Sequence, residues 1–286
     1  MKRTVFLSLA IAMALSLILT GCAQPTPTPP PPTKPAPTQA PAQATKAPAT
    51  AVPPTAAPTA EPVMEITVGT DATWPPFEMV NEKTKELEGF DIDLMNAIAK
   101  EANLKIKWVN IGFDPLLAGM ATGQYDAAIS VITITEDRKK SMLFSDPYYN
   151  AGQLIAVGIN NNTITKPADL KGKKVGAQVG TTGAIEVEKI DKSALKTYDD
   201  IGQAFMDLMN GQIDAVVADS PLVYGYVAKN ASKIKAVGQP FTDEYYGIAV
   251  KKGGEALLAR INAGLKAVKD KGILQQLDEK WVKAKQ

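Results

Sequence analysis

The sequence predicts an α/β protein with two similar lobes and a hinged cleft between them. From Met64 onward, short apolar strands alternate with amphipathic helices, a pattern typical of α/β domains with mainly parallel sheets. Within this region, Gly123 to Ile129 (GQYDAAI) recurs as Gly211 to Val217 (GQIDAVV), each time after an amphipathic helix and before a strand. The chain has 286 residues, which is long enough for one large core or two moderate cores.

Local signals predict the elements of the first lobe. Glu65 to Gly69 and Lys105 to Val109 are expected strands. Asp91 is expected to cap a helix between them. The apolar residues of that helix recur at helical spacing and are Leu94, Met95, Ile98 and Ala102. Asp114 and Pro115 are expected to open a second helix that ends at Gly123.

The second lobe shows the same signals. Lys173 to Gln178 is an expected strand, and a helix is expected to begin within Gly180 to Gly183 (GTTG). The amides at that helix start would suit an anion. Asp199 or Asp200 is expected to cap the helix that leads into the second repeat.

Polar residues follow the two repeated strands, from Ser130 to Thr133 in one lobe and from Ala218 to Ser220 in the other. Ligands of open α/β sheets bind beyond the carboxyl ends of the strands. Two lobes whose strand ends face each other enclose a cleft that can close by hinge motion around a ligand.

The N-terminus predicts a secretory signal. Lys2 and Arg3 precede an apolar run from Val5 to Leu19, which is shorter than the roughly 20 residues of a membrane-spanning helix. The sequence Leu-Thr-Gly-Cys that ends at Cys22 resembles the bacterial lipobox, which implies cleavage after residue 21 and lipidation of Cys22. An uncleaved anchor and a free thiol beside an ordinary cleavage site are the alternatives.

Residues 22–62 are mostly Pro, Thr and Ala and have almost no large apolar side chains. Such a segment cannot bury enough apolar surface to fold, and its prolines favour an extended chain. We expect a disordered tether that holds the folded domain away from a membrane. O-glycosylation or binding of a partner are the alternative uses of a Thr/Pro-rich segment.

Composition excludes several classes of site. The chain has 31 basic and 30 acidic side chains, a balance that makes nucleic acid an unexpected partner. It has no histidine and one cysteine, so we expect no His-based triad, no internal disulfide, no Cys/His metal site and no cofactor. Catalysis would have to use carboxylates, lysines or hydroxyls.

Five motifs together resemble family 3 bacterial solute-binding proteins, the polar amino-acid binders of ABC importers. They are Gly89 to Leu94 (GFDIDL), Ile132 to Lys140 (ITITEDRKK), Phe144 to Tyr149 (FSDPYY), Gly180 to Gly183 (GTTG) and Tyr245 to Ala249 (YYGIA). The resemblance extends from Ile66 to Trp281. It implies a type II periplasmic-binding-protein-like fold in residues 63–286, with lobe 1 at about 63–148 and 250–286 and lobe 2 at about 153–244.

The resemblance also implies how the α-groups of an amino acid would be bound. Arg138 matches the arginine that clamps the α-carboxylate, a task that suits a guanidinium fork. The amide and hydroxyl of Thr182 would assist from the other lobe. Asp219 matches the carboxylate that pairs with the α-ammonium, assisted by the Thr133 hydroxyl and the Val131 carbonyl next to Ser130. Without the family resemblance, an arginine in the local sequence of Arg138 is more often a surface charge. An aspartate in that of Asp219 is equally often part of a turn.

The side-chain pocket implied by the resemblance contains Asp71, Trp74 and Phe113. Two rings can sandwich a guanidinium while Asp71 neutralises it, so arginine or lysine is the favoured ligand. Glutamine binders of the family also carry an aspartate here, which keeps glutamine as a rival. Gln178 stands where some glutamine binders have lysine, and Val131 stands where the family often has Gly or Ser.

The sequence therefore predicts an extracytoplasmic lipoprotein that binds a free L-amino acid as a monomer and delivers it to the membrane subunits of an ABC importer. We expect no catalytic residues. A dehydratase on the same fold is one alternative, because carboxylates such as Asp71 could serve as acid or base. An amino-acid-sensing ligand module is the other.

Overall fold

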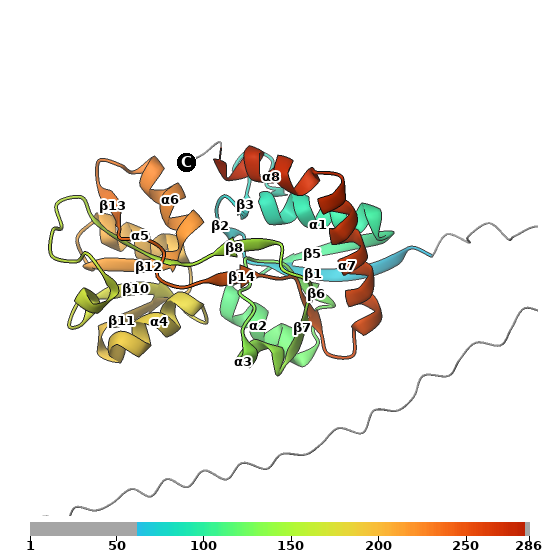
Figure 1. The fold of residues 1–286 in the computed structure, drawn as a ribbon, viewed down its shortest axis with the longest axis horizontal. Helices are drawn as coiled ribbons and strands as arrows, with labels where there is room; N and C mark the ends of the chain where they lie inside the picture. Colours follow the sequence, from blue (N-terminus) through green and yellow to red (C-terminus); the bar gives the residue numbers. More distant parts are fainter. Residues whose placement is uncertain (1–61, 284–286) are drawn as a thin grey trace, which may run out of the picture. The chain divides into compact units, whose positions relative to one another are not determined.

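The computed structural model describes residues 62–283, which form two lobes side by side, each built on a five-stranded sheet (Figure 1). The predicted signal peptide, Cys22 and nearly all of the predicted tether lie outside the described residues. Lobe 1 carries the strands at the beginning and end of the described chain, and lobe 2 is built from the middle of it.

Lobe 1 contains a mixed sheet. Its strands, in spatial order, are β5 (Leu104–Asn110), β1 (Met64–Thr70), β6 (Ala127–Ala128), β15 (Ala249–Lys251) and β7 (Met142–Phe144). β1 pairs in parallel with β5 and β6, whereas β15 pairs in antiparallel fashion with β6 and β7. The C-terminal part of the chain thus completes the sheet that the N-terminal part begins.

Helices cover both faces of this sheet. They are α1 (Phe90–Glu101), α2 (Phe113–Thr122), α3 (Glu136–Lys139), α7 (Glu255–Asp270) and α8 (Ile273–Trp281). The apolar stripe of α1 is buried, as its spacing predicts, and α1 packs against α7. Gly264 permits the close approach, since a Cβ there would lie 2.8 Å from the Ile98 carbonyl oxygen.

Lobe 2 repeats the plan with another mixed sheet. Its strands, in spatial order, are β11 (Leu195–Tyr198), β10 (Val175–Gln178), β12 (Ala215–Asp219), β9 (Gln153–Gly158) and β13 (Ile234–Val237). Its helices are η1 (Pro167–Leu170), α4 (Thr182–Asp191), η2 (Lys192–Ala194), α5 (Ile201–Met209) and α6 (Ser220–Lys229). β10 is parallel to β11 and β12, and β9 is antiparallel to both of its neighbours.

The chain crosses between the lobes twice, in β8 (Tyr149–Ala151) and β14 (Glu244–Tyr246), which pair in antiparallel fashion in the middle of the molecule (Figure 1). Next to them, β2 (Thr73–Trp74), β3 (Glu78–Val80) and β4 (Leu87–Glu88) form a small antiparallel sheet. Gly152, the residue directly after β8, packs closely against the segment that leads back to lobe 1. A Cβ at this position would lie 2.1 Å from the Thr242 carbonyl oxygen.

Two predicted helix caps are wrong. Gly89, not Asp91, is the N-cap of α1, because the Asp91 side chain is turned into the core to accept hydrogen bonds there. Gly112, not Asp114, is the N-cap of α2, which already begins at Phe113. The predicted cap Asp200 is confirmed, since its side chain accepts from the Gly202 amide.

The repeated glycines are confirmed as helix terminators. Gly123 has φ 75° at the C-cap of α2, and Gly211 has φ 71° just after α5. Glycine is favoured at both places because the left-handed conformation has no cost without a Cβ.

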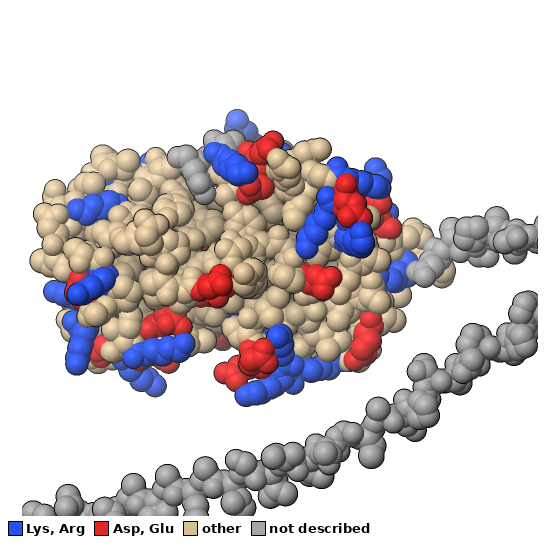
Figure 2. Space-filling model, viewed as in Figure 1, with Lys and Arg blue, Asp and Glu red and all other residues tan. Residues whose placement is uncertain are grey.

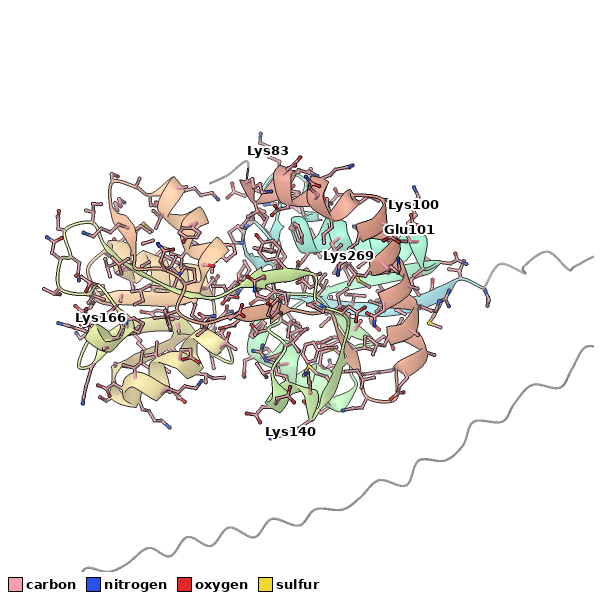
Figure 3. All side chains as sticks on the ribbon, viewed as in Figure 1. Lys83, Lys100, Glu101, Lys140, Lys166 and Lys269 are labelled. Carbon is pink, nitrogen blue, oxygen red and sulfur yellow. The ribbon has the colours of Figure 1, made fainter. Side chains whose placement is uncertain are left out.

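Charged side chains of both signs are intermixed around the rim of the face in Figure 2, and its middle is mostly uncharged apart from separate acidic groups. Lys83, Lys100, Lys140 and Lys166 project from the outer surface in Figure 3. In residues 62–283, no helix has both the length and the apolar character needed to cross a bilayer. The same residues contain no group of three or more His, Cys, Asp or Glu side chains placed to hold a metal ion.

Candidate ligand site

The ends of strands from both lobes meet at one small cavity. Its empty volume, including its opening to solvent, is about 170 Å³. The lining residues are Trp74, Phe113, Val131, Thr133, Arg138, Thr181, Thr182 and Asp219. Seven of the ten residues predicted for the site are in this set, and the predicted residues Asp71, Ser130 and Gln178 lie behind it. The structure therefore brings the predicted residues together.

Arg138 lies in the short helix α3 and reaches across the cavity. Its Nη1 donates to the Thr133 carbonyl oxygen at 2.8 Å, and its Nη2 donates to the Gly180 carbonyl oxygen of lobe 2 at 2.9 Å. Its carbon Cζ is 5.4 Å from the centroid of the Phe113 ring, which supports the cation from one side. Burial of the guanidinium lowers the pKa of Arg138 to about 10, which leaves it charged at neutral pH.

Asp219 ends β12 on the opposite side of the cavity and is buried. Its Oδ1 accepts from Gln153 Nε2 at 2.6 Å, and its Oδ2 accepts from the hydroxyl of Tyr246 at 2.5 Å. Burial, with repulsion from Glu244, raises the pKa of Asp219 to about 7 in spite of these donors and of the attraction of Arg138. Asp219 is therefore only partly ionised near neutral pH, and a cationic group next to it would stabilise the ionised form.

Glu244, at the start of β14, orients two hydroxyl groups of the site. Its Oε2 accepts from Thr133 Oγ1 at 2.8 Å and from Thr182 Oγ1 at 2.7 Å. A hydroxyl that donates to Glu244 presents its oxygen lone pairs elsewhere, which suits Thr133 for accepting from an ammonium group. For Thr182 the geometry favours the backbone amide, at the start of α4, as the donor to a carboxylate, rather than the hydroxyl that the sequence analysis also considered.

Asp71 lies at the far end of the site, just after β1. Its Oδ1 accepts from Thr73 Oγ1 at 3.0 Å, and its Oδ2 accepts from Gln178 Nε2 at 2.8 Å. Gln178 Oε1 in turn accepts from Trp74 Nε1 at 2.5 Å. An amide from lobe 2 thus donates to the Asp71 carboxylate beside the Trp74 ring. Burial raises the pKa of Asp71, as expected for a carboxylate without a cation beside it.

The two predicted aromatic rings flank this region. The centroids of Trp74 and Phe113 are 6.4 Å apart and the ring planes differ by 36°, so the rings are tilted toward each other rather than stacked. Both side chains are buried, yet both line the cavity.

Ser130 and Val131 form the floor between the two ends. The Ser130 hydroxyl accepts from the Asp71 amide at 3.0 Å and donates to Glu78 Oε1 at 2.9 Å. Val131 has φ 43°, a conformation that is a genuine outlier for a β-branched residue. A glycine would adopt this conformation at a lower cost, because it has no Cβ.

Sequence reasoning missed Gln153, Thr181, Glu244 and Tyr246 as parts of the site. Gln153 and Tyr246 hold Asp219, Glu244 orients the threonines, and Thr181 lines the cavity and caps α4. Tyr246 and Thr181 lie inside motifs that the sequence analysis singled out. Nothing local marks Gln153 or Glu244, since they reach the site only through the crossing of β8 and β14.

A family model described as bacterial extracellular solute-binding proteins, family 3, matches residues 66–284. The chain belongs to this family. The match confirms the resemblance drawn from the five sequence motifs.

Relatives within the solute-binding family cover most of the described chain. A probable histidine-binding protein of Neisseria gonorrhoeae is 38% identical over 232 residues, which are 79% of this chain and 86% of the relative. The ABC transporter arginine-binding protein 1 of Escherichia coli (strain K12) is 36% identical over 225 residues, 76% of this chain and 90% of the relative.

Solved structures of the solute-binding family share the fold. An ancestral arginine-binding protein bound to arginine is 43% identical and superposes with a TM-score of 0.73, covering 76% of this chain and 97% of that protein. A structure of an ancestral arginine-binding protein bound to glutamine gives 43% identity, a TM-score of 0.72 and the same coverage. The two-lobed periplasmic-binding-protein-like fold predicted from the sequence is therefore confirmed.

Proposed function

We propose that this chain captures a free L-amino acid between its two lobes and delivers it to an ABC importer. The observation that carries the proposal is the placement of the Arg138 guanidinium and the Asp219 carboxylate on opposite sides of one cavity. Of the five N–H donors of Arg138, two donate to backbone carbonyls, so donors are left for an α-carboxylate. Asp219 and the Thr133 hydroxyl supply acceptors for the α-ammonium.

The charges around the cavity favour a basic ligand. Asp219 and Glu244 lie near Arg138, and a third carboxyl group, Asp71, lies at the far end of the site. A ligand with two cationic groups and one carboxylate complements this set better than a neutral amino acid does. Arginine or lysine is therefore our first choice, and the arginine-binding relatives support it.

Glutamine is the second choice. The Gln178 amide already donates to Asp71 beside Trp74, which is the contact that a glutamine side chain would make. The glutamine-bound ancestral structure shows that a protein of this kind accepts an amide ligand.

Closure of the lobes is the proposed signal to the importer. Arg138, Thr133 and Val131 come from lobe 1, and Thr182 and Asp219 come from lobe 2. A ligand held by both sets stabilises the closed arrangement and shifts the population toward it. The hinges are proposed at residues 149–152 and 245–249, between lobe 1 (about 63–148 and 250–286) and lobe 2 (about 153–244). We assign no catalytic step to the site.

We further propose that residues 1–21 are a signal peptide, that Cys22 is lipidated, and that residues 22–62 are the tether to the outer face of a membrane. The support is the sequence alone: an apolar run, Leu-Thr-Gly-Cys and a Pro-rich segment follow one another. A Cys22→Ser variant should be released from the membrane fraction while still binding its ligand. Retention in the membrane fraction would contradict the lipid anchor.

A thermal-shift screen of the full chain against the twenty amino acids tests the function. A ligand that binds only the folded state raises the melting temperature. A selective rise with arginine or lysine supports the proposed ligand. A rise with glutamine alone would still support an amino-acid-binding protein, but it would make glutamine the first-choice ligand. No rise with any amino acid would contradict the proposed function.

A further inference from the structure

A pair of acidic side chains lies directly behind the floor of the cavity. Glu78 belongs to β3 and Asp91 to α1, and both are fully buried. Within residues 62–283, the groups that donate to these two carboxyl groups are all neutral: a hydroxyl, a backbone amide and a phenol. Two carboxylates cannot both be ionised in such a place without a large cost in free energy.

The pair holds the backbone and side chain of the cavity floor. Asp91 Oδ2 accepts from the Val131 amide at 2.9 Å and from the Tyr148 hydroxyl at 2.8 Å. Glu78 Oε1 accepts from the Ser130 hydroxyl at 2.9 Å. The contact with the Val131 amide matters because Val131 is held at φ 43°, a conformation that a β-branched residue keeps only where its surroundings impose it.

One oxygen of each carboxyl group has no donor among the described residues: Glu78 Oε2 and Asp91 Oδ1. The two carboxyl groups are held side by side. Glu78 and Asp91 accept from the adjacent residues Ser130 and Val131, and the Asp91 amide donates to the carbonyl oxygen of Phe77, the residue before Glu78, at 2.9 Å. A single proton between them turns one oxygen into a donor and the other into its acceptor, so that both are satisfied. Without that proton, two buried oxygen atoms would remain unpaired.

Of the two groups, Asp91 is the better stabilised as an anion and Glu78 the better carrier of the shared proton. Asp91 accepts from an amide and a phenol, which stabilise its anion, whereas Glu78 accepts from one hydroxyl only. Burial raises the pKa of both groups, and repulsion by Asp91 and Asp71 raises the pKa of Glu78 further. Tyr148 also faces the pair, and burial raises its pKa too, so it remains a neutral donor.

We propose that Glu78 and Asp91 share one proton and act as a single buried anion that positions the Ser130–Val131 segment for ligand binding. The positioning role rests on the proposed function, whereas the shared proton does not. Glu78 and Asp91 are positioning residues, since they reach the ligand only through Ser130 and Val131.

Amide substitutions test the shared proton in the full chain without added amino acid. In Glu78→Gln, the oxygen of the new amide accepts from Ser130 and its NH₂ donates to Asp91, which reproduces the neutral acid. In Asp91→Asn, the amide oxygen accepts from Val131 and Tyr148, and its NH₂ faces an ionised Glu78.

The double variant places two NH₂ groups face to face. We expect it to lose much more stability in denaturant unfolding than the sum of the single losses. Glu86→Gln, on the exposed part of the same hairpin, is the control and should match the wild type.

The pH dependence of unfolding gives a readout that a merely structural contact would not change. A carboxyl group whose pKa is raised on folding stabilises the folded state at low pH and loses that contribution as the pH rises. Relative to Glu78→Gln, the free energy of unfolding of the wild type should fall with the slope of one proton as the pH rises above 4.5, the ordinary pKa of a glutamate side chain. The proposal would be overturned if the double variant lost only the sum of the two single losses in stability and if the wild type and Glu78→Gln had parallel curves of stability against pH.

The wild-type chain alone provides a further check if the variants fold poorly. Its infrared spectrum at neutral pH should contain the band of a buried carboxylic acid, and absence of that band would overturn the shared proton. Binding of arginine to the variants is measured separately. If no amino acid binds the wild type, the proposed function fails. The stability and infrared measurements still show whether Glu78 and Asp91 share a proton.

Discussion

Arg138 holds the two lobes together by donating to one carbonyl oxygen in each, at Thr133 and Gly180. Its position over Phe113 and opposite Asp219 makes it the central cation of the cavity. The polar side chains of Thr133, Thr182 and Asp219 around the same cavity each have a hydrogen-bond partner, because buried polar groups are costly when left unpaired. Residue-scale changes should therefore affect affinity through charge and hydrogen bonding.

Arg138→Ala should lower the affinity for arginine by at least about 30-fold, since removing one partner of a buried charged pair costs about 2–5 kcal/mol. Isothermal titration calorimetry measures the loss. Lys139→Ala is the matched control, because the neighbouring Lys139 is exposed and pairs only with Glu136 at the surface. Equal affinities of Arg138→Ala and Lys139→Ala would remove Arg138 from the site.

Asp71→Asn should weaken arginine binding more than glutamine binding. Asparagine retains an oxygen acceptor for an amide but loses the charge that neutralises a guanidinium. Comparison of the two dissociation constants by calorimetry tests this, with the exposed Asp199→Asn as a control. Equal losses for the two ligands would show that Asp71 does not contact the ligand side chain.

Affinity should depend on pH through Asp219. Burial raises its pKa to about 7, and a bound ammonium group stabilises the ionised form, so binding releases a proton. As the pH falls below about 7, affinity should decrease by up to about tenfold per pH unit. Calorimetry in buffers of different ionisation enthalpy measures the released proton. An affinity that is constant across this range would contradict the role of Asp219.

At the scale of elements, the spacing of apolar residues and the residue types at helix ends were sufficient to predict much of the fold. The strands at β1 and β5, the helix end at Gly123 and the start of α4 within Gly180 to Gly183 agree with the structure. These features depend on residues near each other in the chain. The family resemblance added the lobe pattern and the residues that line the cavity.

What the sequence could not predict depends on long-range contacts. Asp91 had the properties of a helix cap, but hydrogen bonds to Val131 and Tyr148 drew it into the core. Glu244 reaches the site because β14 pairs with β8 between the lobes. An aspartate can cap a helix, lie on the surface or lie in the core. Its tertiary partners decide which of these positions it takes, not its neighbours in sequence.

Gly152→Ala tests the packing of the two crossing segments. Its Cβ would lie 2.1 Å from the Thr242 carbonyl oxygen, so the backbone must shift, at a cost of about 1–3 kcal/mol in the free energy of unfolding. Gly158→Ala in β9 is the control, because its Cβ meets nothing within 4 Å. Denaturant unfolding should show a clear loss for the first variant and less than about 1 kcal/mol of change for the second. Equal stability of both variants would contradict the close packing.

At the scale of the whole molecule, several hydrogen bonds between the lobes lie in and around the proposed ligand site. Gln178 of lobe 2 contacts Asp71 and Trp74 of lobe 1, and the Gly180 carbonyl of lobe 2 accepts from Arg138 of lobe 1. A ligand between these groups would link closure to binding, which is the property that an importer can detect. The crossing strands β8 and β14 join the lobes next to that site.

The most direct test of the central claim is titration of the full chain with L-arginine by isothermal calorimetry, followed by the same titration of Asp219→Asn. The account predicts one arginine bound per chain and a marked loss of affinity in the variant. If arginine, lysine, histidine and glutamine all give no binding heat at several temperatures, or if Asp219→Asn binds arginine as the wild type does, the cavity between the lobes is not the amino-acid site.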